Sequence, residues 1–169
     1  MTMEDAQKLL GEQKYVQAAK MLDRLLITEK NSSELFYLRG ITSMKLRKYD
    51  SAQEYWERAL FVERKSKYYK IKGMAYLEIF DVDNAVESFN SALKIEPDDV
   101  ETNFFMSIAY MLMDDHQSAK YMKKAKQLNE RKTKRLAFNF YTLFLKNDPT
   151  ITSAQKSEIL ERIENISRR

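Results

Sequence analysis

The sequence predicts an all-α protein, on the basis of its composition and of an internal repeat. Only three of the 169 residues are glycine and two are proline, whereas β architectures with many turns need more of both. Apolar residues make up 44% of the chain, which is enough for a core. Residue types also recur along the chain at intervals of 33 and 34 residues, a spacing typical of stacked helix pairs.

The repeat is carried by small residues at fixed places in two successive helices. In the first helix of three copies, the small residues are Gly40, Gly73 and Ser107. In the second helix, a small residue, a bulky residue and alanine follow one another as Ala52–Trp56–Ala59, Ala85–Phe89–Ala92 and Ser118–Met122–Ala125. An earlier copy retains its second half in Tyr15, Ala18, Leu22 and Leu25. Small residues let two helices approach closely, and the bulky ones are buried only against a neighbouring pair, so the pairs are expected to stack.

This pattern resembles the tetratricopeptide repeat family. The family is similar in its period, in the small residue midway along a first helix, and in an Ala-x3-aromatic-x2-Ala arrangement on the second. Pro97 matches the proline that often closes that second helix, whereas Arg64 and Glu130 stand where a proline would be expected. The resemblance covers roughly residues 1–130. It implies a right-handed superhelical solenoid of antiparallel helix pairs that binds protein partners.

The expected elements follow from the repeat and from hydrophobic periodicity. About four repeats are predicted, at residues 1–31, 32–65, 66–98 and 99–130, followed in the same domain by a C-terminal helix pair and cap at 131–169. Helices are expected at 2–12, 15–29, 33–46, 50–64, 66–79, 82–95, 99–113, 115–128, 131–146 and 152–167. Asp50 and Asp83 precede alanine-rich stretches and are expected to be N-caps of second helices.

The two C-terminal helices differ from the repeats. Residues 136–145 are apolar almost all round, which predicts burial on more than one side. The last helix carries one apolar stripe and a charged remainder, which predicts a cap with a wet outer face. A dimerisation helix is the alternative at this end, and the chain would then be a self-assembling structural subunit.

Several classes of protein are disfavoured by what the chain lacks. It has no cysteine, so a disulfide framework, a thiolate metal site and a Cys nucleophile are excluded, and a cytoplasmic location is expected. The first twenty residues carry several charges and hold no apolar signal-peptide core, and the most apolar run, 136–145, is about half the length that a membrane span needs. The single histidine, His116, follows Asp114 and Asp115 in an expected turn, where capping explains all three. We therefore expect no enzyme activity, no catalytic or metal-binding residue and no cofactor.

A peptide-binding groove is predicted along the first helices. One stripe beside each small residue is almost entirely apolar, and the matching positions in tetratricopeptide proteins line the concave surface that binds peptides. We call its nine members the groove set: Tyr37, Ile41, Met44, Lys70, Met74, Leu77, Phe104, Ile108 and Met111. The expected function is an adaptor or chaperone-type scaffold whose partner offers an apolar segment, with Lys45 and Lys70 facing acidic residues of that partner. The alternative is that the stripe is covered and belongs to the core.

Cations form a second candidate site. We call eight of them the basic patch: Lys120, Lys123, Lys124, Lys126, Arg131, Lys132, Lys134 and Arg135. A smaller cluster lies between Arg64 and Lys72, with Tyr68 and Tyr69 interleaved. Cations beside aromatic rings suit a phosphate backbone, so a nucleic-acid-associated protein is the alternative function. A solvated helix face is the other explanation, because the net charge is only +4.

Overall fold

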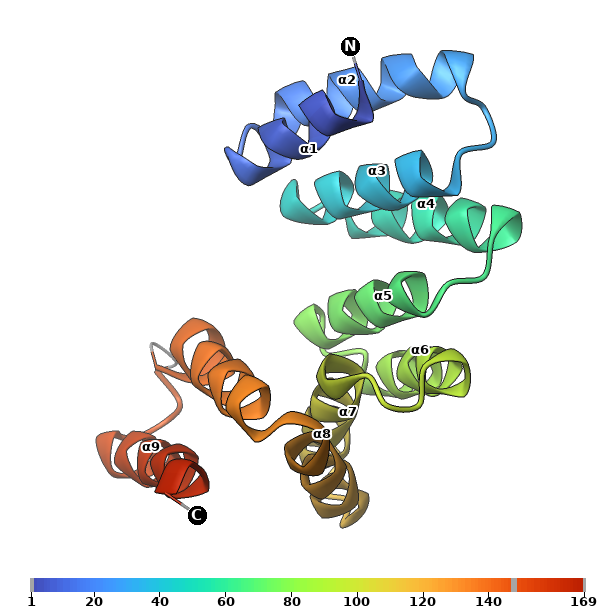
Figure 1. Ribbon diagram of the computed structural model, residues 1–169. Coiled ribbons are helices and arrows are strands. Elements are labelled where there is room, and N and C mark those ends of the chain that lie inside the picture. Colours follow the sequence, from blue (N-terminus) through green and yellow to red (C-terminus); the bar gives the residue numbers. More distant parts are fainter. Residues whose placement is uncertain (1, 147–148, 169) are drawn as a thin grey trace. The chain divides into compact units, whose positions relative to one another are not determined.

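The computed structural model describes residues 2–146 and 149–168, and every regular element within them is a helix (Figure 1). The chain divides into two compact units, residues 1–96 and 97–169. The division lies within two residues of the boundary expected between the third and fourth repeats.

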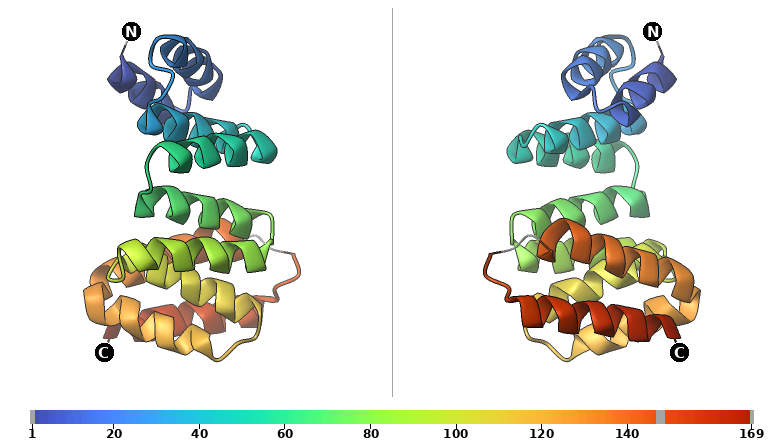
Figure 2. Two further views of the ribbon diagram at one scale, coloured as in Figure 1. Left: turned by 90° about the vertical axis from the view of Figure 1, so that its right-hand side faces the viewer. Right: turned by 90° about the vertical axis from the view of Figure 1, so that its left-hand side faces the viewer.

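The first unit consists of three helix pairs. They are α1 (Met3–Gly11) with α2 (Tyr15–Thr28), α3 (Ser33–Lys45) with α4 (Tyr49–Val62), and α5 (Ser66–Glu78) with α6 (Val82–Ile95). Consecutive helices pack against each other, and the first helices also meet, α1 with α3 and α3 with α5 (Figure 2). These bounds agree with the expected helices to within one or two residues.

The second unit begins with the fourth pair. It contains α7 (Val100–Leu112), α8 (Gln117–Phe140), a single wide π turn η1 (Tyr141–Leu145) and α9 (Ser153–Arg168). The two helices expected at 115–128 and 131–146 are joined in α8, but Asn129 leaves the helical conformation with φ −162° and ψ 95°. Its Oδ1 accepts the Lys132 N–H at 2.8 Å, as an N-cap does. The expected break is therefore present, as a kink.

Burial around the end of α8 is less complete than expected. Ala137 and Tyr141 are buried, but Phe138 is 55% exposed, so the prediction of burial on more than one side was wrong for that side chain. The side chains of Leu143 and Phe144 lie outside the described part of the chain, as do those of Ile159, Ile163 and Ile166 on the last helix.

Close approach within the pairs depends on the repeated glycines. A β-carbon at Gly40 would overlap the indole of Trp56, and one at Gly73 would come 2.6 Å from Cε1 of Phe89. Neither glycine has a positive φ, so what each position requires is the missing side chain and not an unusual backbone. The predicted role of these small residues is confirmed.

The first repeat is complete in the structure. Ala6 is fully buried on α1, 34 residues before Gly40, and packs with Leu22, Leu25, Leu35 and Leu38. The sequence repeat predicts only the second half of this copy. An alanine at the position that is glycine or serine in the later copies was the signal available for the first half.

Each first helix ends in the same turn. The residue that closes it has a positive φ of 54–59°, at Gln13, Arg47, Phe80 and Asp114. The next N–H then bonds to a carbonyl five residues back, for example Lys48 to Ser43 and Asp81 to Tyr76, each at 2.9 Å. This is the Schellman arrangement, which usually has glycine at the left-handed position. It recurs at the repeat period although the four residues share no chemical property.

The expected N-caps were wrong by two residues. The residues before α4 and α6 are Lys48 and Asp81, whereas Asp50 and Asp83 lie in the first turns of these helices. Asp81 accepts the Asn84 N–H, and Lys48 makes no side-chain cap. The physical reason is that the Schellman turn ends at the residue directly before α4 and directly before α6, which fixes where these two helices begin.

Candidate peptide-binding surface on α3 and α5

The first unit brings six members of the groove set onto two adjacent helices. Tyr37, Ile41 and Met44 lie on α3, and Lys70, Met74 and Leu77 lie on α5, which packs beside it. Five of them are partly exposed, but Met44 is only 6% exposed and belongs to the core with Ala52, Trp56 and Ala75. Tyr37 and Ile41 pack against that core and still reach the surface.

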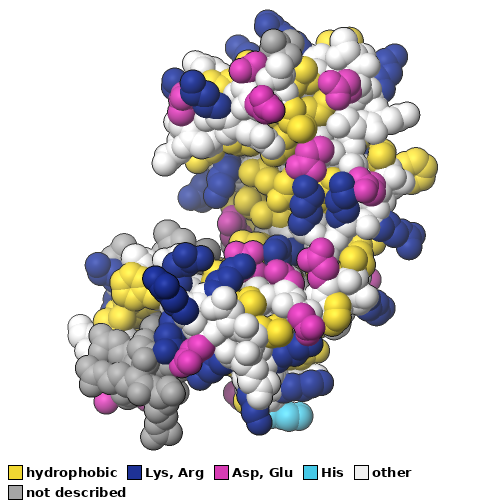
Figure 3. Space-filling view, viewed as in Figure 1, with side chains coloured by type: hydrophobic (Ala, Val, Ile, Leu, Met, Phe, Trp, Pro, Cys, Tyr) yellow, Lys and Arg dark blue, Asp and Glu magenta, His cyan; other side chains and the backbone are white. Residues whose placement is uncertain are grey.

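The space-filling view shows how these two helices meet the solvent. Hydrophobic side chains gather in a hollow over α3 and α5, with lysine or arginine and acidic side chains at its border (Figure 3). The partly exposed apolar strip on this unit therefore consists of Tyr37, Ile41, Met74 and Leu77.

The members of the groove set in the second unit are not equally accessible. Phe104 is fully buried and Ile108 is 5% exposed, whereas Met111 is 50% exposed. Phe104 packs edge to face against Phe105, with ring centroids 5.3 Å apart. Within this unit, only Met111 of the three is a surface side chain.

A polar network fixes α5 against the α3–α4 pair. Lys67 Nζ is 2.6 Å from Glu34 Oε2 and also lies over the ring of Tyr37, 5.0 Å from its centroid. The hydroxyl of Tyr68 lies 3.1 Å from Ser33 Oγ and 3.2 Å from Glu34 Oε2, so its single proton is donated to one of the two. Because Tyr68 is fully buried, desolvation raises the pKa of its phenol.

Three of the cations between Arg64 and Lys72 pair with acids. Lys65 pairs with Glu63 at 2.7 Å and Lys72 with Glu57 at 3.2 Å, in addition to the Lys67–Glu34 pair. The Lys65 hydrogen bond, followed by that of Ser33, lowers the pKa of Glu63. Lys67 and Lys72 therefore balance acids of the preceding repeat, and Lys65 balances an acid two residues before it. Sequence reasoning missed Ser33 and Glu34, although Glu34 and Lys67 are opposite charges one repeat apart.

The basic patch is divided by the kink at Asn129. Of its eight members, Lys120, Lys123, Arg131 and Arg135 are exposed. Three others pair with acids: Lys124 with Asp98 at 3.2 Å, Lys132 with Glu101 at 3.7 Å, and Lys134 with Glu130 at 2.8 Å. Lys126 is partly exposed. The two ends of the patch thus lie on helix segments of different direction, and part of its charge is balanced.

The acidic turns have structural roles. Asp115 Oδ1 accepts the Gln117 N–H at 2.8 Å, and the His116 side chain beside it is 97% exposed. The described residues contain no group of three or more His, Cys, Asp or Glu side chains placed to hold a metal ion. Nor does any described helix have the length and apolar character needed to cross a membrane.

Comparison with known proteins identifies the repeat. A sequence pattern described as tetratricopeptide repeat matches residues 66–99, the segment that forms α5 and α6. Residues 66–99 are therefore a tetratricopeptide repeat. The whole chain is 23% identical over 164 residues to the TPR repeat-containing protein MJ1428 of Methanocaldococcus jannaschii. The match covers 94% of the chain but 29% of that relative, so the chain spans less than a third of its length.

Solved structures of tetratricopeptide repeat proteins share the fold. MamA of Desulfovibrio magneticus RS-1, from residue 41 to its end, is 21% identical with a TM-score of 0.72, covering 98% of this chain and 92% of that one. TTC0263, a thermophilic TPR protein of Thermus thermophilus, is 15% identical with a TM-score of 0.70, covering 98% of this chain and 96% of that one. At these identities the likeness concerns the fold alone.

Proposed function

We propose that this protein is an adaptor or chaperone-type scaffold that binds a protein segment on the surface of α3 and α5. The observation that carries the proposal is the strip of partly exposed apolar side chains, Tyr37, Ile41, Met74 and Leu77, on two adjacent first helices. Such a strip suits the apolar face of an amphipathic helix or an extended hydrophobic peptide. Methionine adds an adaptable side chain at such a surface.

Charge at the border of the strip favours a ligand with acidic residues. Lys45 is the last residue of α3 and is exposed, and Lys70 on α5 is partly exposed. Acidic residues of the ligand next to its apolar segment would face these two lysines. Phe104 and Ile108 are left out of the proposed contacts because they are buried, and Met111 is kept as an exposed candidate of the second unit.

The proposal is tested by selecting peptides from a display library on the wild-type protein. The selected peptides are then measured against a Met74→Glu, Leu77→Glu variant, in which two partly exposed strip residues become acidic. We expect this variant to lose at least about tenfold in affinity, since apolar contacts are replaced by charges that need solvation. Val16→Glu is the matched control, because Val16 is an exposed aliphatic residue (58%) on α2.

An equal loss of peptide affinity in both variants, or no loss in either, would refute the α3–α5 site. Circular dichroism confirms that each variant keeps its helices. The salt dependence of binding distinguishes a peptide-binding protein from a nucleic-acid-binding one. The affinity of an apolar contact changes little with salt, whereas the affinity for phosphates falls steeply as the salt concentration rises. A nucleic-acid ligand that binds both variants equally, and is lost in a Lys120→Ala, Lys123→Ala variant, would assign binding to the basic patch.

A further inference from the structure

A second apolar surface lies on the outward side of α4. Phe61 is 94% exposed, more than any other large hydrophobic side chain in the described part of the chain, and Val62 beside it is 41% exposed. One repeat earlier, 34 residues before Phe61, Ile27 near the end of α2 is 69% exposed. Single exposed apolar residues are common, but here three of them border one region.

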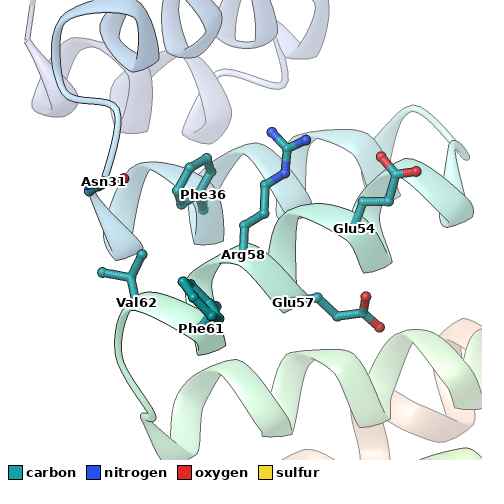
Figure 4. Close-up of a pocket in the computed structure, with 7 residues that line it drawn as sticks. All are labelled: Asn31, Phe36, Glu54, Glu57, Arg58, Phe61 and Val62. Atoms are coloured by element: carbon teal, nitrogen blue, oxygen red, sulfur yellow. The ribbon is translucent and has the colours of Figure 1, made fainter.

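An open depression of about 630 Å³ adjoins Phe61 (Figure 4). It is lined by Asn31 and by six residues that we call the α4 face: Phe36, Glu54, Glu57, Arg58, Phe61 and Val62. Phe36, from α3, is 8% exposed and supplies an apolar floor. A neighbouring depression of about 340 Å³ shares Phe36 and Arg58 and extends to Ile27 on α2. The region is therefore a shallow apolar hollow with a projecting phenylalanine at its edge.

The charged side chains of the α4 face have both signs. Arg58 lies near two aromatic rings, its guanidinium carbon 6.0 Å from the ring centroid of Phe36 and 5.8 Å from that of Tyr55. Glu54 and Glu57 are exposed on the same helix, at most one turn before Arg58, and one oxygen of Glu57 also pairs with Lys72 of α5 at 3.2 Å. On α4 the residues 54, 57, 58 and 61 share one stripe, whereas Ala52, Trp56 and Ala59 face inward and are fully buried.

A surface with these properties is complementary to itself. In a two-fold interface the same patch meets itself, so a projection on it needs a recess on the same patch, and a charge on it needs the opposite charge there. The α4 face offers Phe61 as the projection, the hollow over Phe36 as the recess, and Arg58 beside Glu54 and Glu57. A partner other than a second copy would have to supply the same combination of an aromatic anchor and both signs of charge.

We propose that the α4 face is the interface of a symmetric homodimer. Two α4 helices cross in antiparallel fashion, Phe61 of each protomer occupies the hollow of its partner, and Arg58 of each faces Glu54 and Glu57 of its partner. The charge pairs fix the register, and the phenylalanine supplies most of the affinity. This surface is separate from the strip on α3 and α5, so one chain can dimerise and bind a peptide at the same time.

The test is the molar mass of the wild-type protein in solution, by sedimentation equilibrium over a wide range of concentrations. We expect a monomer–dimer equilibrium, whose dissociation constant rises at least about 30-fold in Phe61→Glu. Phe80→Glu is the matched control, because Phe80 is also a highly exposed phenylalanine (75%) of the same unit but does not line the depression. The Met74→Glu, Leu77→Glu variant should dimerise as the wild type does.

Charge reversal tests the register. Each of the changes Glu54→Arg, Glu57→Arg and Arg58→Glu should weaken the homodimer. An equimolar mixture of a chain with both Glu54→Arg and Glu57→Arg and a chain with Arg58→Glu should regain the mass of a dimer. A wild type that stays monomeric at every concentration overturns the proposal, as does a Phe61→Glu protein that dimerises normally or a Phe80→Glu protein that is equally impaired. If the wild type is monomeric and the peptides selected on it do not bind the Phe61→Glu variant, the α4 face binds a peptide partner instead.

Discussion

The indole of Trp56 lies directly against the backbone of Gly40. A β-carbon at residue 40 would come 2.5 Å from Cδ1 of that ring, closer than carbon atoms pack. The indole N–H donates to the carbonyl of Tyr37 at 3.3 Å, so the ring is also held in orientation on α3. Since Trp56 and Gly40 are both buried, this contact sets how closely α3 and α4 approach.

Gly40→Ala should therefore destabilise the first unit by about 1–3 kcal/mol, because the added methyl forces the indole or the helix to move. Urea unfolding followed by circular dichroism measures the change. Gly11→Ala is the control, since a β-carbon there meets nothing within 4 Å. That variant should be unchanged or more stable by up to about 1 kcal/mol, as alanine is the better helix former. Equal stability of the two variants would contradict this account of α3–α4 packing.

The equivalent pair one repeat later, Gly73 and Phe89, allows a coupled test. Gly73→Leu should cost about 1–3 kcal/mol or more by overpacking against the fully buried Phe89 ring. In a Phe89→Ala background the same change should cost less, because the ring that it meets is absent. A double-mutant cycle in urea gives the coupling free energy, and strictly additive costs would show that the two residues do not oppose each other.

The turn between α5 and α6 should be improved by glycine. Phe80 has a φ of 59° and its side chain is 75% exposed, so the position has the left-handed strain of an L-residue and little compensating burial. Phe80→Gly should raise the free energy of unfolding by up to about 1 kcal/mol. Thermal and urea unfolding both measure it. A loss of stability would show that Phe80 makes a packing contribution larger than the strain.

Alkaline pH should weaken the contact of α5 with the preceding repeat through Tyr68. Burial raises the pKa of its phenol above the ordinary value of about 10, so the folded state favours the protonated form. That contribution is complete below pH 10 and is lost as the pH rises through the higher folded pKa, because the unfolded chain then releases the proton first.

Urea unfolding of wild type and Tyr68→Phe at pH 8 and at higher pH isolates this effect from the titration of lysines. The variant should be less stable at pH 8, because the hydrogen bond to Ser33 or Glu34 is lost. The difference between the two proteins should shrink above pH 10. A constant difference across this range would mean that Tyr68 titrates as an exposed phenol does.

The extent of sequence-based prediction differs between the fold and the sites. Helix positions could be predicted because Gly40, Gly73, Trp56 and Phe89 recur at a fixed period, and packing gives each residue type one role. The surface strip could be predicted only in part. Helical spacing groups Met44, Phe104 and Ile108 with Ile41 and Met74, but it does not say which members a neighbouring helix covers. The pairing of Glu34 with Lys67 likewise depends on how two repeats dock.

The sequence by itself determined the period, the all-α class and the close approach at the glycines, because these follow from local propensity and from side-chain size. Tertiary structure alone decided three other features. It placed Gln13, Arg47, Phe80 and Asp114 in the same left-handed turn, since backbone hydrogen bonds and not residue type define that turn. It buried Met44 while leaving Phe61 at the surface, and it balanced cations of α5 against acids of the preceding pair. Burial and pairing depend on which surfaces meet, and only the folded chain brings those surfaces together.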